Sequence, residues 1–431
     1  MSAWKWDVVI YDRPGWNSFT YNYPIEGMIR QRGDEIMIRF DSADESRIND
    51  DFYYEHYRQI VLSSKDGGLT WEEIEPDWAY YVPLKLSDGT LVEVVAARQM
   101  VSREEQKARL EELGIGSIWR EDCLLRWDMW PECMAAELQG KGLTIWDKKV
   151  REGSDWRYLP DGVVATHASS DLITRRSADG GLTWKEDRIP DVESFSHFVT
   201  CFAGSVVLPD DTILIPCYGV KKKQEGASEF FESLLGSGLF ILRSEDRGET
   251  YRFIEIPGEN SMDRNLDEVS LVSHPSGRVV ALFRSDAAGC HIHQSISEDG
   301  GKSWGVPQRT GMQGLPLNAL CLKSGRMLCA YARRWHPAGM RATLSYDGGE
   351  TWDVASEKVL RDDALPACFL GGPGVIQLDD ESIFAFYSLP KLVTLKKDDL
   401  VDQEKMIMDR NFHQYIAGSR FTEEYLGPLG R

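Results

Sequence analysis

The chain has 431 residues, of which 42% are apolar, and its formal net charge is −20 at pH 7. A chain of this length and apolar content can bury an ample core. The acidic charge argues against nucleic acid and anionic membrane surfaces as partners. The sequence also contains no apolar span of about twenty residues, the length that crosses a bilayer as a helix. We therefore expect no membrane partner.

The eight cysteines show no metal-ligand spacing and lie mostly in strand-like runs. We therefore expect buried, reduced thiols, no metal site and no cofactor. The chain opens with Met-Ser-Ala-Trp-Lys-Trp-Asp, which does not resemble a secretory leader. These features predict a cytoplasmic protein. No linker rich in proline, glycine or serine divides residues 1–431, so we expect one domain and leave the oligomeric state open.

Five copies of one short pattern, Ser-x-Asp-x-Gly-x-Thr-Trp with small variations, recur along the chain. Each copy is expected to form a turn between two strands. The Ser and Asp side chains bind the turn backbone, a glycine takes the positive φ, and the aromatic residue packs beneath. The five copies begin at Ser64, Ser177, Ser244, Ser297 and Ser345.

The spacing of these copies predicts the architecture. Steps of 67, 53 and 48 residues separate the last four aspartates of the pattern, and such steps suit four-stranded blades of a β-propeller. The first step, from Asp66 to Asp179, is 113 residues. It is too long for one ordinary blade, so it holds either an insertion or an additional blade that has lost its pattern.

Apolar runs broken by a tight turn supply an independent count of blades. Each run predicts a strand, a turn and a second strand. There are six clear runs and a weaker seventh at 158–165. We favour an all-β, six-bladed propeller of four-stranded antiparallel blades, with seven blades as the alternative. The six runs are residues 28–40, 82–95, 206–215, 269–283, 317–330 and 375–386.

Residues 97–150 are predicted to be an insertion within the second blade. Ser102 as N-cap, acidic residues in the first turn and Gly114 at the end predict a short helix. The four tryptophans between residues 119 and 146 form either a sugar-stacking wall or a small satellite core. Residues 5–11 and 413–421 both have strand character, and we expect 413–421 to be the ring-closing strand of a blade shared by the two ends.

The repeated pattern resembles the Asp-box, or BNR repeat, of the sialidase-like β-propellers. The resemblance extends to residues 267–284, where a glutamate begins one strand and an arginine ends the next. It implies that Glu268 takes a catalytic role and that Arg284 binds substrate. On physical grounds a glutamate at the start of an inner strand points to the central mouth of a propeller. The alternative is an internal ion pair that joins two strands.

Other positions depart from the sialidase pattern. No arginine occupies the first blade's inner strand near residues 21–28, and Gly371-Gly372-Pro373-Gly374 stands where the nucleophilic tyrosine is expected. A third substrate-binding arginine is Arg341, or less directly Arg333 or Arg334. We therefore expect a sialidase-like enzyme that is not a typical neuraminidase.

A general acid is expected on the loop at residues 41–57, which is rich in carboxylates. Asp51 is the first choice and Glu55 the second, each to be paired with Glu268 across a glycosidic oxygen. These residues predict a glycoside hydrolase acting on a non-sialic glycan or oligosaccharide.

Histidines suggest a second chemistry. His167 and His197 are candidate substrate-binding residues, and His197 with Tyr218 and Arg284 also suits a polysaccharide lyase. A non-catalytic glycan-binding propeller is the third possibility. His291 and His293 share one strand face but have no third ligand in view, so no zinc site is expected.

Overall fold

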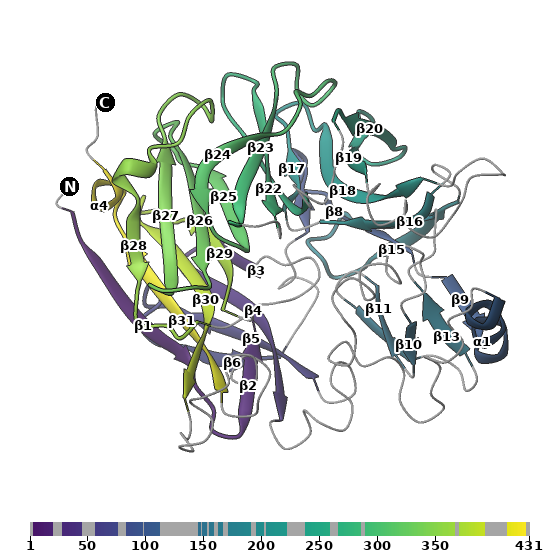
Figure 1. The fold of residues 1–431 in the computed structure, drawn as a ribbon, viewed down its shortest axis with the longest axis horizontal. Coiled ribbons are helices and arrows are strands. Elements are labelled where there is room, and N and C mark those ends of the chain that lie inside the picture. The colour runs from purple at the N-terminus through teal and green to yellow at the C-terminus, as the bar shows by residue number, and fades with distance from the viewer. Residues whose placement is uncertain are drawn as a thin grey trace.

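The structure is a computed structural model in which most of the described strands form the six antiparallel sheets of a six-bladed β-propeller (Figure 1). The described residues contain very little helix. The predicted fold class is therefore confirmed, and six blades replace the seven-bladed alternative. The structure describes residues 3–19, 28–44, 57–75, 83–97, 99–112, 145–147, 149–152, 155–158, 163–166, 171–190, 195–201, 204–221, 238–258, 266–285, 289–366, 370–392 and 412–427.

The first three blades follow one another along the chain. In blades 1 and 3 two short strands share the inner position, since both pair with the same second strand. Blade 1 consists of β2 (Trp16–Phe19), β3 (Met28–Arg32), β4 (Glu35–Asp44), β5 (Tyr57–Ser64) and β6 (Glu72–Ile74). Blade 2 consists of β7 (Leu84–Lys85), β8 (Leu91–Ala96), β14 (Leu172–Ser177) and β15 (Lys185–Ile189). Blade 3 consists of β16 (Phe195–Thr200), β17 (Val206–Val207), β18 (Ile213–Lys221), β19 (Gly238–Ser244) and β20 (Arg252–Ile256).

The last blade combines strands from both ends of the chain. Blade 4 consists of β21 (Leu266–Ser273), β22 (Val279–Ser285), β23 (His291–Ser297) and β24 (Gln308–Gln313). Blade 5 consists of β25 (Leu317–Cys321), β26 (Met327–Arg333), β27 (Gly339–Ser345) and β28 (Lys358–Arg361), with a short 3-10 helix at Val354–Ser356. Blade 6 consists of β29 (Gly371–Gln377), β30 (Ile383–Leu392), β31 (Phe412–Phe421) and β1 (Lys5–Tyr11), and it is followed by α4 (Glu423–Leu426).

The two ends of the chain meet in blade 6. The N-terminal strand β1 pairs antiparallel with β31, from Lys5 opposite Phe421 to Tyr11 opposite Ile416. Figure 1 shows the two termini side by side. The pairing places both ends of the chain in one blade and so closes the ring between blade 6 and blade 1.

The long step between the first two Asp-boxes holds an insertion between β8 and β14. Its helix α1 (Arg103–Glu112) begins after Ser102, whose hydroxyl accepts a hydrogen bond from the backbone N–H of Glu105 at 3.1 Å. The carboxylate of Glu105 in turn accepts one from the backbone N–H of Ser102 at 3.0 Å, which completes a capping box. The described strands of the insertion are β9 (Gln99–Ser102), β10 (Ile145–Asp147), β11 (Lys149–Glu152), β12 (Asp155–Tyr158) and β13 (Val163–Thr166).

The weak seventh unit does not form a blade. Its two strands belong to different small sheets, because β12 pairs with β11 whereas β13 pairs with β9 and β10. A strand–turn–strand pattern in the sequence therefore does not become a hairpin here.

The core lies between blades. In the described part of the chain, five clusters of buried apolar side chains each join two neighbouring blades. Strands in the second position are consequently buried on both faces, as in β22, where every residue from Val279 to Ser285 is buried. A blade covered on both sides selects a continuous apolar run rather than strict alternation.

The Asp-boxes have the hydrogen bonds that the sequence predicts. In the first box, Oδ1 of Asp66 accepts the backbone N–H of Thr70 at 2.9 Å, and Oδ2 accepts its hydroxyl at 2.6 Å. Gly67 and Gly68 have φ values of 75° and 96°. The indole of Trp71 donates to the carbonyl of Gly68 at 3.0 Å. Hydrogen bonds from the side chain and backbone of Thr70 lower the pKa of Asp66 from 3.8 to about 2.

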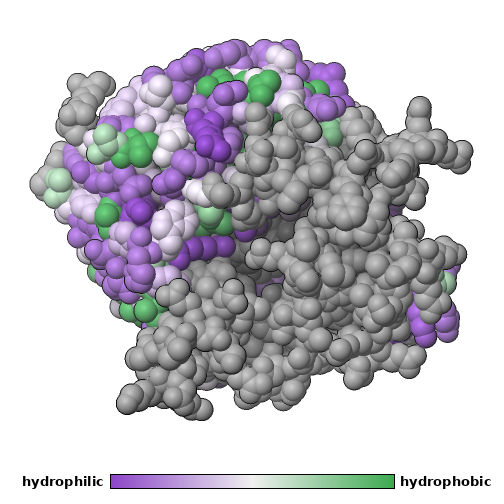
Figure 2. All heavy atoms as spheres, in the orientation of Figure 1, coloured by the Kyte–Doolittle hydropathy of each residue, from purple (hydrophilic) through white to green (hydrophobic). Residues whose placement is uncertain are grey.

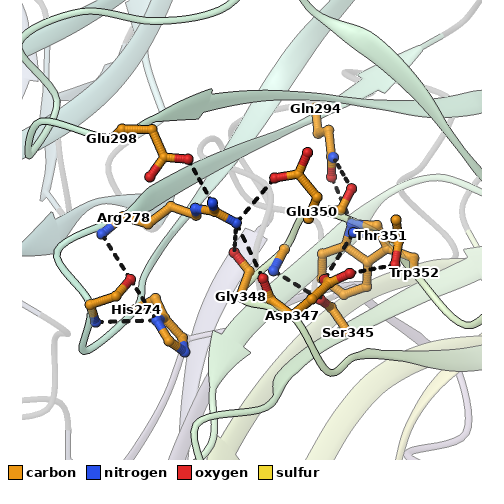
Figure 3. A network of polar contacts seen from close by, with 12 residues as sticks. His274, Arg278, Gln294, Glu298, Ser345, Asp347, Gly348, Glu350, Thr351 and Trp352 are labelled. Atoms are coloured by element: carbon orange, nitrogen blue, oxygen red, sulfur yellow. Dashed lines mark hydrogen bonds and ion pairs between the residues drawn. The ribbon is translucent and has the colours of Figure 1, made fainter.

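The boxes of blades 1, 4 and 5 also bind the blade before them. Figure 3 shows the contact between blades 4 and 5, where Arg278 reaches from the turn after β21 into the box of blade 5. Its guanidinium donates to the carbonyls of Asp347 and Gly348 at 3.2 and 3.4 Å. It also pairs with Glu298 at 2.6 Å and Glu350 at 3.2 Å. Arginine contacts of this kind attach one blade to the next outside the apolar core.

The same contact recurs around the ring. The guanidinium of Arg420 in blade 6 donates to the carbonyl of Gly67 in the box of blade 1 at 2.8 Å. That of Arg243 in blade 3 donates to the carbonyl of Gly300 in the box of blade 4 at 3.4 Å. The boxes therefore lie on one face of the propeller together with the turns between first and second strands.

Candidate active site

The opposite face, which we call the insertion face, is where the first strand of each blade begins and the second strand ends. The first strands of neighbouring blades contact one another, for example β21 with β25 and β25 with β29, so they form the inner ring. The insertion after β8, with α1, starts at the insertion face. The space-filling view shows a hollow near the middle of the molecule (Figure 2).

Glu268 lies at the insertion-face end of the inner strand β21. It is the extra residue of a β-bulge, because Asp267 pairs with Arg284 and Val269 pairs with Phe283 while Glu268 has no opposite residue. Its φ is 38°, in the left-handed region that non-glycine residues rarely adopt. Its exposure is 8%. A strained, buried glutamate at a strand start is a feature that clusters at functional sites.

Arg284, near the end of β22, holds this glutamate. Its Nη1 pairs with Oε1 of Glu268, and its Nε lies 3.9 Å from Oδ1 of Asp267. The Arg284 and Glu268 side chains are 11% and 7% exposed, whereas that of Asp267 is 25% exposed. The arrangement is therefore one guanidinium between two carboxylates, one buried and one accessible.

Blade 3 packs closely against the start of β21. A Cβ on Gly204 would lie 2.1 Å from the carbonyl oxygen of Val269, so only glycine permits this approach. Val269 and Leu266 join Tyr218 of β18 in one core cluster. This packing fixes the backbone on both sides of Glu268, which is what maintains a strained φ.

Arg341 lies on β27, the third strand of blade 5. Its guanidinium donates to the carbonyls of Pro337 and Arg361, each at 2.7 Å, and to that of Met340 at 3.0 Å. Its Nε is 3.6 Å from a carboxylate oxygen of Glu357. Burial lowers the pKa of Arg341, an effect that Glu357 opposes. The contact of Arg341 with substrate stays a prediction, and these contacts give its charge a structural role.

The two alternative arginines lie at the insertion-face end of β26, where Arg333 is the last residue of the strand and Arg334 follows it. Arg334 donates from Nε to the carbonyl of Leu370 at 3.1 Å. The guanidinium carbon of Arg333 lies 5.7 Å from the ring centroid of Trp335. Their contact with substrate stays a prediction.

The remaining predicted residues are only partly covered. His197 lies in the inner strand β16 of blade 3, opposite Val220. Asp51, Glu55 and His167 lie outside the described residues. Their roles stay predictions.

Asp267 is the site residue to which the sequence analysis gave no role. It precedes Glu268 directly, and the Asp-Glu pair was the available signal. Only the bulge shows that both side chains approach Arg284, because in a regular strand neighbouring residues point to opposite faces.

Among the described residues, no group of three or more histidine, cysteine, aspartate or glutamate side chains could hold a metal ion. No helix in the described part of the chain is long and apolar enough to cross a membrane.

The model of the BNR repeat-like domain matches residues 155–394, more than half of the chain, and this segment contains the last four Asp-boxes. The chain belongs to the BNR repeat-like family. No curated protein matches it in sequence.

Solved structures show the same fold at low sequence identity. A protein of unknown function from Dyadobacter fermentans DSM 18053 superposes with a TM-score of 0.60 at 21% identity, over 96% of this chain and 97% of that one. The NanB sialidase from Streptococcus pneumoniae gives 0.53 at 13% identity, over 97% and 71%. The Trypanosoma rangeli sialidase, solved in complex with sialic acid, gives 0.50 at 14% identity, over 97% of this chain and 59% of that one. The resemblance to the sialidase-like propellers is thereby confirmed for the BNR repeat-like chain.

Proposed function

We propose that this BNR repeat-like protein is a carbohydrate-active enzyme, a glycoside hydrolase that acts on a non-sialic glycan at the insertion face. The observation that carries the proposal is the buried Glu268–Arg284 pair. It lies at the start of an inner strand, with a strained backbone, in a propeller of the sialidase-like superfamily. A structural ion pair alone does not require Glu268 to adopt a left-handed φ.

The start of β29 supports a departure from sialidase chemistry. A Cβ on Gly371 would lie 2.5 Å from Cβ of Ala332, so blade 5 occupies the space of a side chain at that position. The glycine-rich segment that replaces the expected tyrosine is thus packed against its neighbour. Without that nucleophile, hydrolysis would rely on two carboxyl groups.

In this scheme Glu268, in its ionised form, acts as the nucleophile or the general base, and a loop residue, Asp51 or Glu55, acts as the general acid. Contact with a guanidinium favours the ionised form of a carboxyl group, which suits a nucleophile or a general base. The acid would protonate the glycosidic oxygen. A separation of roughly 5–5.5 Å between the two carboxyl groups would indicate retention of configuration, and roughly 6.5–9.5 Å inversion.

The test is a screen of the purified protein against fluorogenic glycosides of neutral, N-acetylated and sialic sugars, followed by Glu268→Gln. The matched control is Glu298→Gln, which changes an exposed glutamate on the face of the propeller that carries the Asp-boxes. We expect Glu268→Gln to lower turnover by roughly 10²–10⁴-fold while glycan binding persists, since such losses are typical of a general acid or base. The control should retain turnover.

Three outcomes would contradict the proposal. Hydrolysis restricted to sialosides would indicate a true sialidase. An unsaturated uronate product would indicate the lyase, and glycan binding unchanged by Glu268→Gln without any turnover would indicate a binding propeller.

The cytoplasmic location expected from the sequence remains part of this proposal. Its support is that the cysteines in the described residues form no disulfide with one another: Cys201, Cys217, Cys290, Cys321 and Cys329. Disulfides are rare in the cytosol, where thiols are kept reduced.

A further inference from the structure

The charges around Arg284 suggest which sugars the site accepts. Arg284 is bracketed by Glu268 in direct contact and by Asp267 at 3.9 Å, so the three groups together carry a net charge of −1. We infer that the site selects uncharged or amino sugars over anionic ones, and that Asp267 is the residue that sets this selectivity. The inference rests on the proposed function, since it concerns the substrate of that same site.

Binding of an anionic sugar to this cluster is expected to be unfavourable. The carboxylate of a sialic acid or a uronate requires a positive charge that a protein carboxylate does not already neutralise, and the guanidinium of Arg284 is already paired in a largely buried contact. A ligand carboxylate within reach of Arg284 would also lie close to the Asp267 and Glu268 carboxylates. Juxtaposed like charges suppress binding strongly where solvent screening is weak. The chain's net charge of −20 acts in the same direction.

Asp267 has the exposure that a ligand contact requires. Its side chain is 25% exposed, against 7% for that of Glu268. An ionised carboxylate accepts hydrogen bonds and has no donor, so it suits sugar hydroxyls and the ammonium group of an amino sugar. In this assignment Glu268 contacts the reacting bond, and Asp267 contacts a neighbouring hydroxyl or amino group of the sugar.

The other arginines described on or near the insertion face do not restore an anion site at Arg284. The guanidinium of Arg341 donates to three backbone carbonyls, and Arg334 donates to a fourth. Arg333 stacks on Trp335. Arg333 is therefore the cation at the end of β26 that the experiment tests as a competing anion contact.

The experiment measures binding of the labelled protein to a glycan array that carries neutral, amino, uronate, sulfated and sialylated sugars. Asp267→Asn removes one charge with little change of shape. Asp34→Asn is the matched control, since Asp34 lies on the exposed turn after β3, on the opposite face. A third variant, Arg333→Gln, reports on the competing cation.

We expect the wild-type protein to bind neutral or amino glycans. Asp267→Asn should raise the ratio of anionic to neutral binding by roughly tenfold or more, as removal of a nearby like charge predicts. The Asp34→Asn profile should match wild type. Two results overturn the inference alone: an unchanged profile in Asp267→Asn, or wild-type binding of anionic glycans that is lost in Arg333→Gln.

The array also separates this inference from the proposed function. If Asp267→Asn shifts the profile but no glycoside is hydrolysed, the selectivity stands and the hydrolase proposal fails. If the wild-type protein binds no glycan of any class, both fail.

Discussion

The contact between Glu268 and Arg284 predicts an unequal response to removal of its two partners. Arg284→Met removes the guanidinium that contacts both carboxylates, one of them on a side chain only 7% exposed. Breaking a buried ion pair by removing one partner typically costs about 3–5 kcal/mol, because the remaining charge is buried and uncompensated. We expect the free energy of unfolding to fall by an amount in this range.

Glu268→Gln is expected to cost less. The amide oxygen still accepts a hydrogen bond from Arg284, and Asp267 remains as a counter-ion 3.9 Å from Nε. The loss is then the difference between a charged and a neutral acceptor, about 1–3 kcal/mol. The double variant should be less destabilised than the sum of the two single variants, since both act on one contact.

Urea-induced unfolding followed by tryptophan fluorescence would measure these differences for the wild-type protein, both single variants and the double variant. The decisive quantity is the order of the two single variants. If Glu268→Gln destabilises the protein as much as Arg284→Met, or if both cost well under 1 kcal/mol, the pair is screened by solvent. The reasoning from burial would then be refuted.

Three further predictions concern the scaffold. Arg278→Met should lower the free energy of unfolding by about 1–3 kcal/mol, since two carbonyls of the next box lose a charged donor. The control Arg252→Met removes an exposed ion pair and should cost at most about 1 kcal/mol. Equal urea midpoints for the two variants would contradict the interblade role of Arg278. The pKa of Asp66 is lowered to about 2 in the folded state, so its contribution to stability is complete above the unfolded value near 3.8 and is lost as the pH falls toward 2. In acid titrations, Asp66→Asn should therefore lose less stability between these two pH values than the wild-type protein. An unchanged slope would contradict the contribution of Asp66. Gly371→Ala should destabilise the protein by about 1–3 kcal/mol more than Gly89→Ala, since both glycines have a positive φ but only Gly371 lies against a neighbouring side chain. Similar melting temperatures for the two variants would indicate that blade 5 moves to accommodate the added methyl group.

Local features of the sequence predicted the scaffold well. The Asp-box is a turn whose hydrogen bonds lie within a few residues, so Asp66 and Thr70 define it without reference to the rest of the chain. The six apolar runs likewise correspond to hairpins between first and second strands. The local sequence pattern predicted less well which strands pair when the partners lie far apart in the sequence. Residues 158–165, for example, were predicted to form a hairpin but belong to two different small sheets.

The candidate site was predicted only in part, because its geometry depends on tertiary contacts. The sequence indicated Glu268 and Arg284 but not the bulge that brings Asp267 to the same guanidinium. It also gave no means to see that Arg341 donates to carbonyls of Pro337, Met340 and Arg361, groups that only the folded blade brings together.

The shared blade at the chain ends has a consequence for synthesis on the ribosome. Lys5 of β1 pairs with Phe421 of β31, 416 residues later. At roughly 5–20 residues per second, these partners are made about 20–80 s apart. During that interval the first strand to emerge has no partner in its own sheet. A chain that stops before β31 is made lacks the strand on which β1 docks, so completion of the ring depends on the last tenth of translation.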